Sequence, residues 1–244
     1  AQMTFNFDVF WAALTSWVFF EAALISLALA LLSHASAIAI SMPLALGLDS
    51  RRKAVRIAIR LYVGGFRAIP TLLWLLFFWN ALPQFSPVFR ENWYTPFIAA
   101  WIALTVNEAA YQVEINRAAL NSVDKGQTSA ATAFGFTPWQ VFRLVTLPQA
   151  ARVALPPTVN EFITLLKATS LASVISLQEL MTVTNQAVAS SFQFQEYYAV
   201  AALYYLIIVG LLTLIQSRAE HQFDWTVERS ARRGWLGRAK EQSQ

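Results

Sequence analysis

Three long stretches of this sequence contain no charged residue. They run from Ala22 to Leu48, from Ala68 to Phe89 and from Tyr197 to Ser217. A helix needs roughly 20 apolar residues to cross about 30 Å of hydrocarbon, and each stretch is at least that long. Buried helices of a soluble protein are the other explanation, but three such runs in 244 residues favour a membrane protein. The charged fraction of 13% agrees, because soluble domains carry about a quarter.

The distribution of basic residues predicts how the chain threads the membrane. We expect five spanning helices near residues 20–48, 57–83, 96–116, 157–181 and 197–217. Lys and Arg concentrate in the first and third connections and after the last span, whereas the other two connections hold only Arg90. Cytoplasmic connections are enriched in Lys and Arg, so the N-terminus is predicted outside and the C-terminus in the cytoplasm. The predicted fold class is an all-α integral membrane protein.

The domain organisation follows from these spans. Residues 1–19 are expected to form an external or interfacial segment, 20–217 the transmembrane domain and 218–244 a basic cytoplasmic tail. Aromatic side chains at the edges of the spans suit the head-group layer of a bilayer. They are Trp11, Trp17, Trp93, Tyr94, Tyr197 and Tyr198.

Several function classes have no signature in this sequence. It contains no cysteine and only two histidines, His34 and His221, so neither a disulfide framework nor a metal site is expected. There is no phosphate-binding GxxxxGK[ST] loop and no GxSxG or HExxH motif, so no catalytic residue is assigned. The net charge of +4 could suit nucleic acid, but each basic cluster adjoins a hydrophobic run and suits anionic lipid instead. His34 is predicted to be packed and hydrogen-bonded.

The connection between the third and fourth spans is too long for a simple loop. It uses about forty residues and carries the signals of helix ends. Asp124 is a suitable N-cap, and Gly135 can close a first short helix. The segment Thr137–Gln140 has the pattern of a capping box with proline at the first helical position. Pro148 follows that second helix, and Pro156-Pro157 precedes the fourth span. We therefore predict two short helices across the cytoplasmic face, within residues 121–150.

This pair of helices combines small residues with bulky aromatic ones. Small side chains allow a partner's backbone to approach, and aromatic side chains can anchor in a groove. The same composition also suits a hairpin that packs on its own protein, and both interpretations stay open at this point. The residues concerned are Ser129, Ala130, Ala131, Phe134, Gly135, Phe136 and Trp139.

The spacing of Ala130-Ala131, Gly135 and Leu147-Pro148 resembles the "EAA" loop of ABC-importer permeases. Flanking segments are similar to the polar-amino-acid branch of that family, and the resemblance covers about residues 20 to 220. These segments are Phe66-Arg67, Pro70, Asn107, Ala109-Ala110-Tyr111, Glu114-Ile115, Arg117, Gly126-Gln127, Phe134 to Gln140, Gln149-Ala150, Ala154 to Pro157, Asn160-Glu161-Phe162, Leu165-Leu166-Lys167 and Thr169 to Ile175.

The resemblance implies an importer in which this chain is one permease subunit. A second permease, identical or paralogous, would pair with it in the bacterial inner membrane. A dimer of ATP-binding subunits would dock on the EAA loops and hold ATP and magnesium, so that this chain binds no cofactor itself. An external binding protein would deliver the amino acid. Ser129 stands where the family usually has Glu, and Arg67-Ala68-Ile69-Pro70 replaces the usual Arg-Gly-Thr-Pro. Both departures favour a heterodimer slightly.

Polar residues inside the spans mark a candidate substrate path. Asn107, Tyr111 and Glu114 share one helix face, which could line a watery path or hold neighbouring helices together. Glu114 could also pair with Arg117, and Glu161 is a candidate partner for Lys167. Pro70 predicts a kink or break near Gly64-Gly65. The complete set of candidate path residues is Asn107, Tyr111, Glu114, Arg67, Lys167, Thr169, Ser170 and Ser173.

Two other functions fit the same spans. An ion-coupled carrier or channel would use Glu114 and Lys167 and would work without an ATPase. A membrane scaffold would use the cytoplasmic helices only to recruit a partner and would carry no solute.

Overall fold

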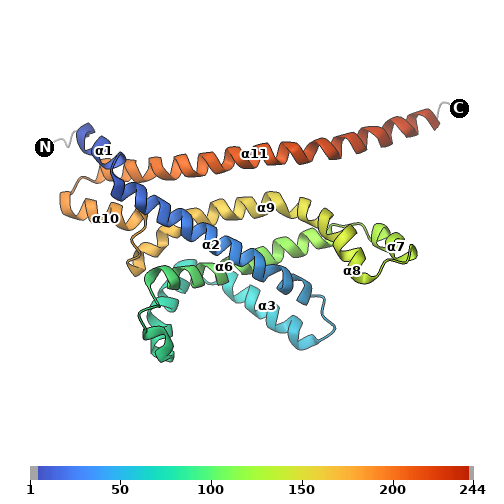
Figure 1. Ribbon diagram of the computed structural model, residues 1–244, viewed down its shortest axis with the longest axis horizontal. Coiled ribbons are helices and arrows are strands. Elements are labelled where there is room, and N and C mark those ends of the chain that lie inside the picture. The colour runs from blue at the N-terminus through green and yellow to red at the C-terminus, as the bar shows by residue number, and fades with distance from the viewer. Residues whose placement is uncertain (1–4, 242–244) are drawn as a thin grey trace. The chain divides into compact units, whose positions relative to one another are not determined.

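The computed structural model describes the backbone of residues 5–241 and the side chains of residues 5–218. Every regular element in this part of the chain is helical (Figure 1). The chain divides into two units, Ala1–Leu206 and Ile207–Gln244. The second unit is the continuation of the last helix, and it contains the predicted basic tail. Residues 1–4 and 242–244 and the side chains after Arg218 lie outside the described residues.

The helices follow one another with short connections. In chain order they are α1 (Phe7–Leu14), α2 (Trp17–Gly47), α3 (Lys53–Ala68), α4 (Thr71–Leu76), the π-helical turn η1 (Phe77–Ala81), α5 (Leu82–Phe85), the 3-10 turn η2 (Pro87–Arg90), α6 (Pro96–Asn121), α7 (Lys125–Ala133), α8 (Pro138–Val141), the π-helical turn η3 (Phe142–Thr146), α9 (Leu147–Ala168), the 3-10 segment η4 (Thr169–Ile175), α10 (Leu180–Ser191) and α11 (Phe194–Glu241).

Small residues allow helices α2 and α6 to pack closely in the centre of the first unit. On α2 the buried face includes Ala30, Ser33 and Ala37, and on α6 it includes Ala103 and Ala110. Helices in membranes associate through close backbone approach at such residues, because lipid removes the hydrophobic driving force between them. Larger side chains fill the layer around this contact, and Leu29, Leu75 and Leu104 are completely buried there.

The second predicted span is broken, but not where the glycine pair suggested. Helix α3 continues through Gly64-Gly65 and ends at Ala68, so the predicted position of the break was wrong. Ile69 is extended, with φ −93° and ψ 133°, because the residue before a proline is disfavoured in the helical region. The chain turns by 104° between α3 and the segment Thr71–Phe85.

The fourth predicted span also has different ends. Helix α9 begins at Leu147 and passes through Pro156 and Pro157 to Ala168, whereas the prediction was one helix over 157–181. A 3-10 segment follows as far as Ile175, and Ser176 then adopts a left-handed conformation with φ 60°. The chain resumes as α10, capped by the buried carboxylate of Glu179, which accepts hydrogen bonds from the backbone of Met181 and Thr182.

One residue assigned to the head-group layer is part of the core instead. Tyr94 is only 6% exposed, and its hydroxyl donates to the carbonyl oxygen of Phe78 at 2.6 Å. Burial raises the pKa of this phenol, which therefore remains a donor. Trp11, Trp17, Trp93 and Tyr198 are exposed, as expected for that layer.

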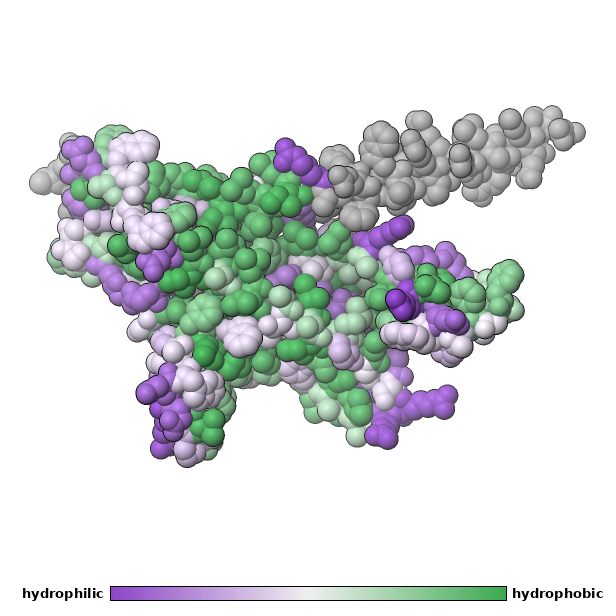
Figure 2. Space-filling model, in the orientation of Figure 1, coloured by the Kyte–Doolittle hydropathy of each residue, from purple (hydrophilic) through white to green (hydrophobic). Residues whose placement is uncertain are grey.

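The helices agree with a membrane location. Two of them, α2 and the segment Phe194–Arg218 of α11, are long and apolar enough to cross a bilayer, and the bent pair α3 with α4–α5 could be a third span. Figure 2 shows a hydrophobic middle on one face of the first unit, with hydrophilic residues toward its ends. The other two predicted spans fall on α6, which carries buried polar side chains, and on α9, which contains partly buried or exposed polar residues and two prolines. The count of five spans stays a prediction.

Candidate functional site

Local hydrogen bonds shape the α7–α8 hairpin, which comprises residues 124–141. The carboxylate of Asp124 accepts from the backbone of Gly126, as an N-cap does. The capping box of α8 is present: the Thr137 backbone donates to Gln140 Oε1 at 2.8 Å, and the Gln140 backbone donates to Thr137 Oγ1 at 3.4 Å. Gly135 has φ +82°, which closes α7 and turns the chain toward α8. The predicted caps are confirmed.

The tip of the α7–α8 hairpin presents exposed aromatic side chains. Phe134 is 84% exposed, Trp139 65% and Phe136 40%. Ser129 and Ala130 are also exposed, whereas Ala131 is buried. Large apolar side chains on an exposed turn are typical of a surface that another protein covers. Of the two interpretations from the sequence, this arrangement favours docking for all the predicted residues except Ala131.

The hairpin is joined to α9 without a break in the helix. Residues 142–146 form the π-helical turn η3, through which α8 continues into α9, so Pro148 does not end the second short helix as the sequence suggested. The side-chain amide of Gln149 donates to Gln127 Oε1 at 2.6 Å and to the carbonyl oxygen of Val145 at 3.0 Å. The α7–α8 hairpin is therefore connected to α9 by both a continuous helix and a hydrogen bond.

A polar cavity of about 250 Å³ lies between α4, α6 and α9. Asn107 stands at its wall and holds the broken span in place. Its amide donates to the carbonyl oxygen of Phe66 at 2.8 Å, and its oxygen accepts from Thr71 Oγ1 at 3.0 Å. Pro70 has no N–H, so the Phe66 carbonyl lacks its usual helical partner four residues later. The polar lining residues are Thr71, Asn107, Glu108, Tyr111, Glu161 and Thr164.

Two of the predicted path residues thus line this cavity, and a third is next to it. Asn107 and Tyr111 belong to the lining. Arg67, at the end of α3, places its guanidinium carbon 5.3 Å from the centre of the Tyr111 ring, which is within the range of a cation–π contact.

The other predicted path residues lie outside the cavity lining. Glu114 faces Arg117, three residues further on, with 3.9 Å between the charged atoms. Lys167 is exposed, and the described residues include no ion pair between it and Glu161. The hydroxyls of Thr169, Ser170 and Ser173 donate to the carbonyl oxygens of Leu166, Lys167 and Ser170 respectively, so they bond to their own helix.

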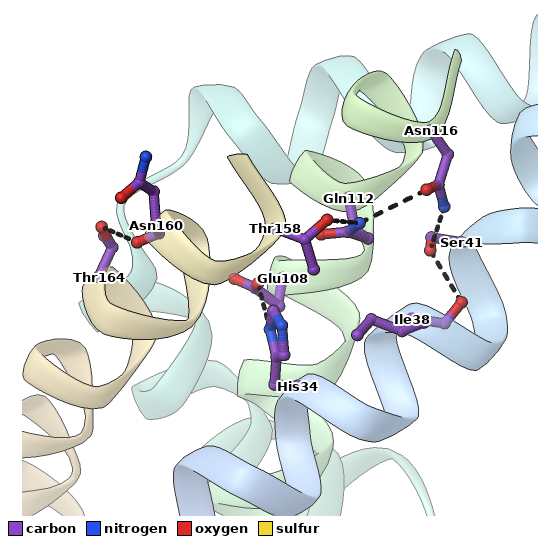
Figure 3. A network of polar contacts seen from close by, with 9 residues as sticks. All are labelled: His34, Ile38, Ser41, Glu108, Gln112, Asn116, Thr158, Asn160 and Thr164. Atoms are coloured by element: carbon purple, nitrogen blue, oxygen red, sulfur yellow. Dashed lines mark hydrogen bonds and ion pairs between the residues drawn. The ribbon is translucent and has the colours of Figure 1, made fainter. Parts of the chain in front are cut away.

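A second polar row on α6 was not recognised in the sequence. Glu108, Gln112 and Asn116 are all buried and follow one another at intervals of four residues (Figure 3). Glu108 Oε1 lies 3.0 Å from His34 Nδ1, which confirms that His34 is packed and hydrogen-bonded. The four-residue spacing was visible in the sequence, but it does not say which helices face the row.

The part of this row that contains Gln112 and Asn116 connects three helices. Gln112 Nε2 donates to Thr158 Oγ1 on α9 at 2.7 Å, and Asn116 Nδ2 donates to Ser41 Oγ on α2 at 2.9 Å (Figure 3). In a membrane interior, such hydrogen bonds hold neighbouring helices in a fixed register.

Comparison with known proteins gives consistent matches. A family model described as the binding-protein-dependent transport system inner membrane component matches residues 37–223. The probable amino-acid permease protein YxeN of Bacillus subtilis is 38% identical over 161 residues, which cover 66% of this chain and 71% of the relative. The octopine transport system permease protein OccM of Rhizobium radiobacter is 34% identical, over 82% of this chain and 86% of the relative.

Solved structures share this architecture. A crystal structure of an amino acid ABC transporter with histidines aligns with a TM-score of 0.76 at 30% identity, covering 84% of this chain and 94% of that chain. An inward-facing structure of the MetNI methionine ABC transporter aligns with a TM-score of 0.72 at 22% identity, which shows that the two chains share a fold. The family model covers most of the chain and describes bacterial inner-membrane subunits. The chain is therefore a multi-pass membrane protein that belongs to the family of binding-protein-dependent transport system inner membrane components, among its amino-acid ABC transporter permeases.

Proposed function

We propose that this chain moves a polar amino acid, or a derivative of one, across the inner membrane, with energy from a separate ATPase that docks on the α7–α8 hairpin. The observation that carries this proposal is the continuous connection from the exposed hairpin through η3 into α9, because α9 also lines the polar cavity. Movement of the hairpin would alter one wall of that cavity, which is a physical route to alternating access.

The partners follow from the same arrangement. The proposed complex contains a second permease subunit, identical or paralogous, a dimer of ATP-binding subunits beneath the hairpins, and an external substrate-binding protein. ATP and magnesium would be held by the ATP-binding subunits, and this chain would bind no cofactor. Ser129 is exposed on α7 where the family usually has Glu, so docking here would depend more on the aromatic residues.

The proposed substrate path passes through the cavity between α4, α6 and α9. We assign Asn107, Tyr111 and Arg67 to this path because they line or border the cavity. Thr71 and Glu161 are added because they line the same space. Glu114 and Lys167, on which a carrier without an ATPase would depend, are not part of the lining. No observation favours that second function.

Substitution of the exposed aromatic residues tests this proposal. Phe134→Ala together with Trp139→Ala should leave the amount of folded permease unchanged, because both side chains are largely exposed. The double variant should lose most ATP-dependent uptake and fail to co-purify with the ATPase, since the anchors of a protein interface carry much of its binding energy. Uptake of radiolabelled amino acids into proteoliposomes, with pull-down of the ATPase, measures both effects.

The control is Phe85→Ala, which removes an aromatic side chain that is 77% exposed on α5, far from the hairpin in sequence. It should retain both uptake and ATPase binding. Normal ATP-dependent uptake by the hairpin double variant would show that the ATPase does not act through these residues.

A further inference from the structure

Two carboxylates from different helices face the polar cavity. Glu108 belongs to α6 and is only 3% exposed, and Glu161 belongs to α9 and is partly buried. Like charges that face one space of low dielectric constant repel each other, and a bound cation between them relieves that repulsion. Two walls of the cavity therefore carry a carboxyl group, which a bound cation would stabilise in its ionised form.

The protein supplies hydrogen-bond donors to only some of the oxygen atoms of these two carboxylates. Glu108 Oε1 accepts from His34, and Figure 3 shows its other oxygen turned away from that imidazole. Among the described residues, neither that second oxygen nor the carboxylate of Glu161 has a hydrogen-bond donor. A neutral His34 can donate from Nδ1 and leave Glu108 negatively charged. Buried carboxylate oxygens usually accept a hydrogen bond. Oxygens that face a cavity without a donor from the protein therefore indicate that the ligand supplies the donor.

Neither Arg67 nor Lys167 forms an ion pair with the two carboxylates in the described part of the chain. Arg67 lies over the Tyr111 ring, at the edge of the cavity. Lys167 is exposed and does not line the cavity. A zwitterionic amino acid brings one ammonium and one carboxylate. Arg67 can attract the carboxylate and Glu161 the ammonium, which leaves Glu108 without a counter-charge.

We propose that the cavity selects amino acids with a cationic side chain, ammonium or guanidinium, and that Glu108, oriented by His34, is the residue that determines this specificity. The inference depends on the proposed function, because it assigns the substrate class of the same cavity. A volume of about 250 Å³ corresponds to roughly eight water molecules, which suits one amino acid rather than a peptide.

The experiment compares two probes of nearly equal shape. L-Arginine carries a guanidinium group and L-citrulline a neutral ureido group, so a difference in their binding reports the charge. Equilibrium binding of each radiolabelled probe is measured on the permease–ATPase complex in nanodiscs without the binding protein, whose own selectivity is thereby removed. We expect arginine to bind at least about tenfold tighter than citrulline, because a desolvated charge pair contributes more than a neutral hydrogen bond.

Single substitutions then test which side chain causes the preference for arginine over citrulline. Glu108→Gln should abolish the difference between the probes, whereas Glu108→Asp, which keeps the charge, should retain part of it. Glu114→Gln is the matched control, since Glu114 lies on the same helix outside the cavity, and it should retain the full preference. Thermal unfolding of each variant shows whether it is folded.

Three results would overturn this inference: equal binding of the two probes by the unmodified complex, no binding of either, or a preference that survives Glu108→Gln. None of them would contradict the proposed function if ATP-dependent uptake of a neutral amino acid were observed in the same preparation. Loss of all ATP-dependent uptake by the unmodified complex would contradict the proposed function itself.

Discussion

At the scale of single residues, the most informative side chain is Asn107. It compensates for a donor that Pro70 lacks, and it also fixes Thr71 at the start of α4. One amide therefore stabilises a 104° change of direction inside the membrane domain. Broken helices in membranes persist where neighbouring groups satisfy the freed backbone, and Asn107 supplies that group here.

Replacement of Asn107 tests this role. Asn107→Leu should lower the free energy of unfolding by about 1–3 kcal/mol, since it leaves the buried Phe66 carbonyl without a donor. Asn80→Leu is the control, because Asn80 also bonds a backbone carbonyl, that of Leu76, but is exposed. Thermal unfolding in detergent should show a clear decrease for the first variant and little change for the second. Equal effects would mean that the Asn107 hydrogen bonds do not stabilise the break.

At the scale of elements, the α7–α8 hairpin and α9 form one continuous piece. The π-helical turn η3 joins them, and the Gln127–Gln149 hydrogen bond closes the hairpin onto the first turn of α9. The geometry of the hairpin itself depends on Gly135, whose φ of +82° is costly for any residue with a Cβ atom.

Alanine substitutions at two glycines distinguish the backbone strain of a positive φ from the general effect of replacing a glycine. Gly135→Ala should destabilise the hairpin by about 1–2 kcal/mol because of its positive φ, although an added Cβ would meet no other atom. Gly64→Ala, in the interior of α3 and equally free of contacts, should be neutral or stabilise by up to about 1 kcal/mol. Hydrogen exchange across residues 124–141 checks the first variant. Unchanged protection would show that the turn tolerates alanine.

Local chemistry made some elements predictable from the sequence. Both ends of α7 and the start of α8 each depend on residues within four positions of one another, so Asp124, Gly135 and the Thr137–Gln140 box predict them. The break lies at Ile69 and not at Gly64-Gly65, because glycines inside a helix do not by themselves interrupt it, whereas the steric effect of Pro70 on the residue before it does. The sequence predicts a later start for α9 because Pro156-Pro157 resembles a helix start, whereas the helix passes through both prolines.

The candidate site was less predictable, since it depends on which helices meet. Asn107 and Tyr111 were recognised from one face of α6, but Glu108 was not assigned to the path because its importance arises from His34 and Glu161, far away in the sequence. Thr169, Ser170 and Ser173 are polar residues whose own helix satisfies them, and no local pattern separates them from path residues.

At the scale of the whole molecule, the first unit has an exposed surface that suits a partner protein and a cavity that suits a solute. The exposed aromatic tip of the hairpin and the polar cavity share helix α9 as their connection. The hydrogen bonds along α6 join it to α2 and α9 and hold these helices in register. This arrangement agrees with the membership of the chain in the ABC permease family.

Cross-linking from α7 to the ATPase tests the central claim most directly. The chain has no cysteine, so Ser129→Cys introduces a single thiol into the permease, at an exposed position on α7. In the reconstituted complex, a short bifunctional reagent should link this thiol to the ATPase in a manner that changes with ATP, and Phe85→Cys should give no such product. Modification of Cys at position 129 by a membrane-impermeant thiol reagent added outside intact cells, without any link to the ATPase, would contradict the account.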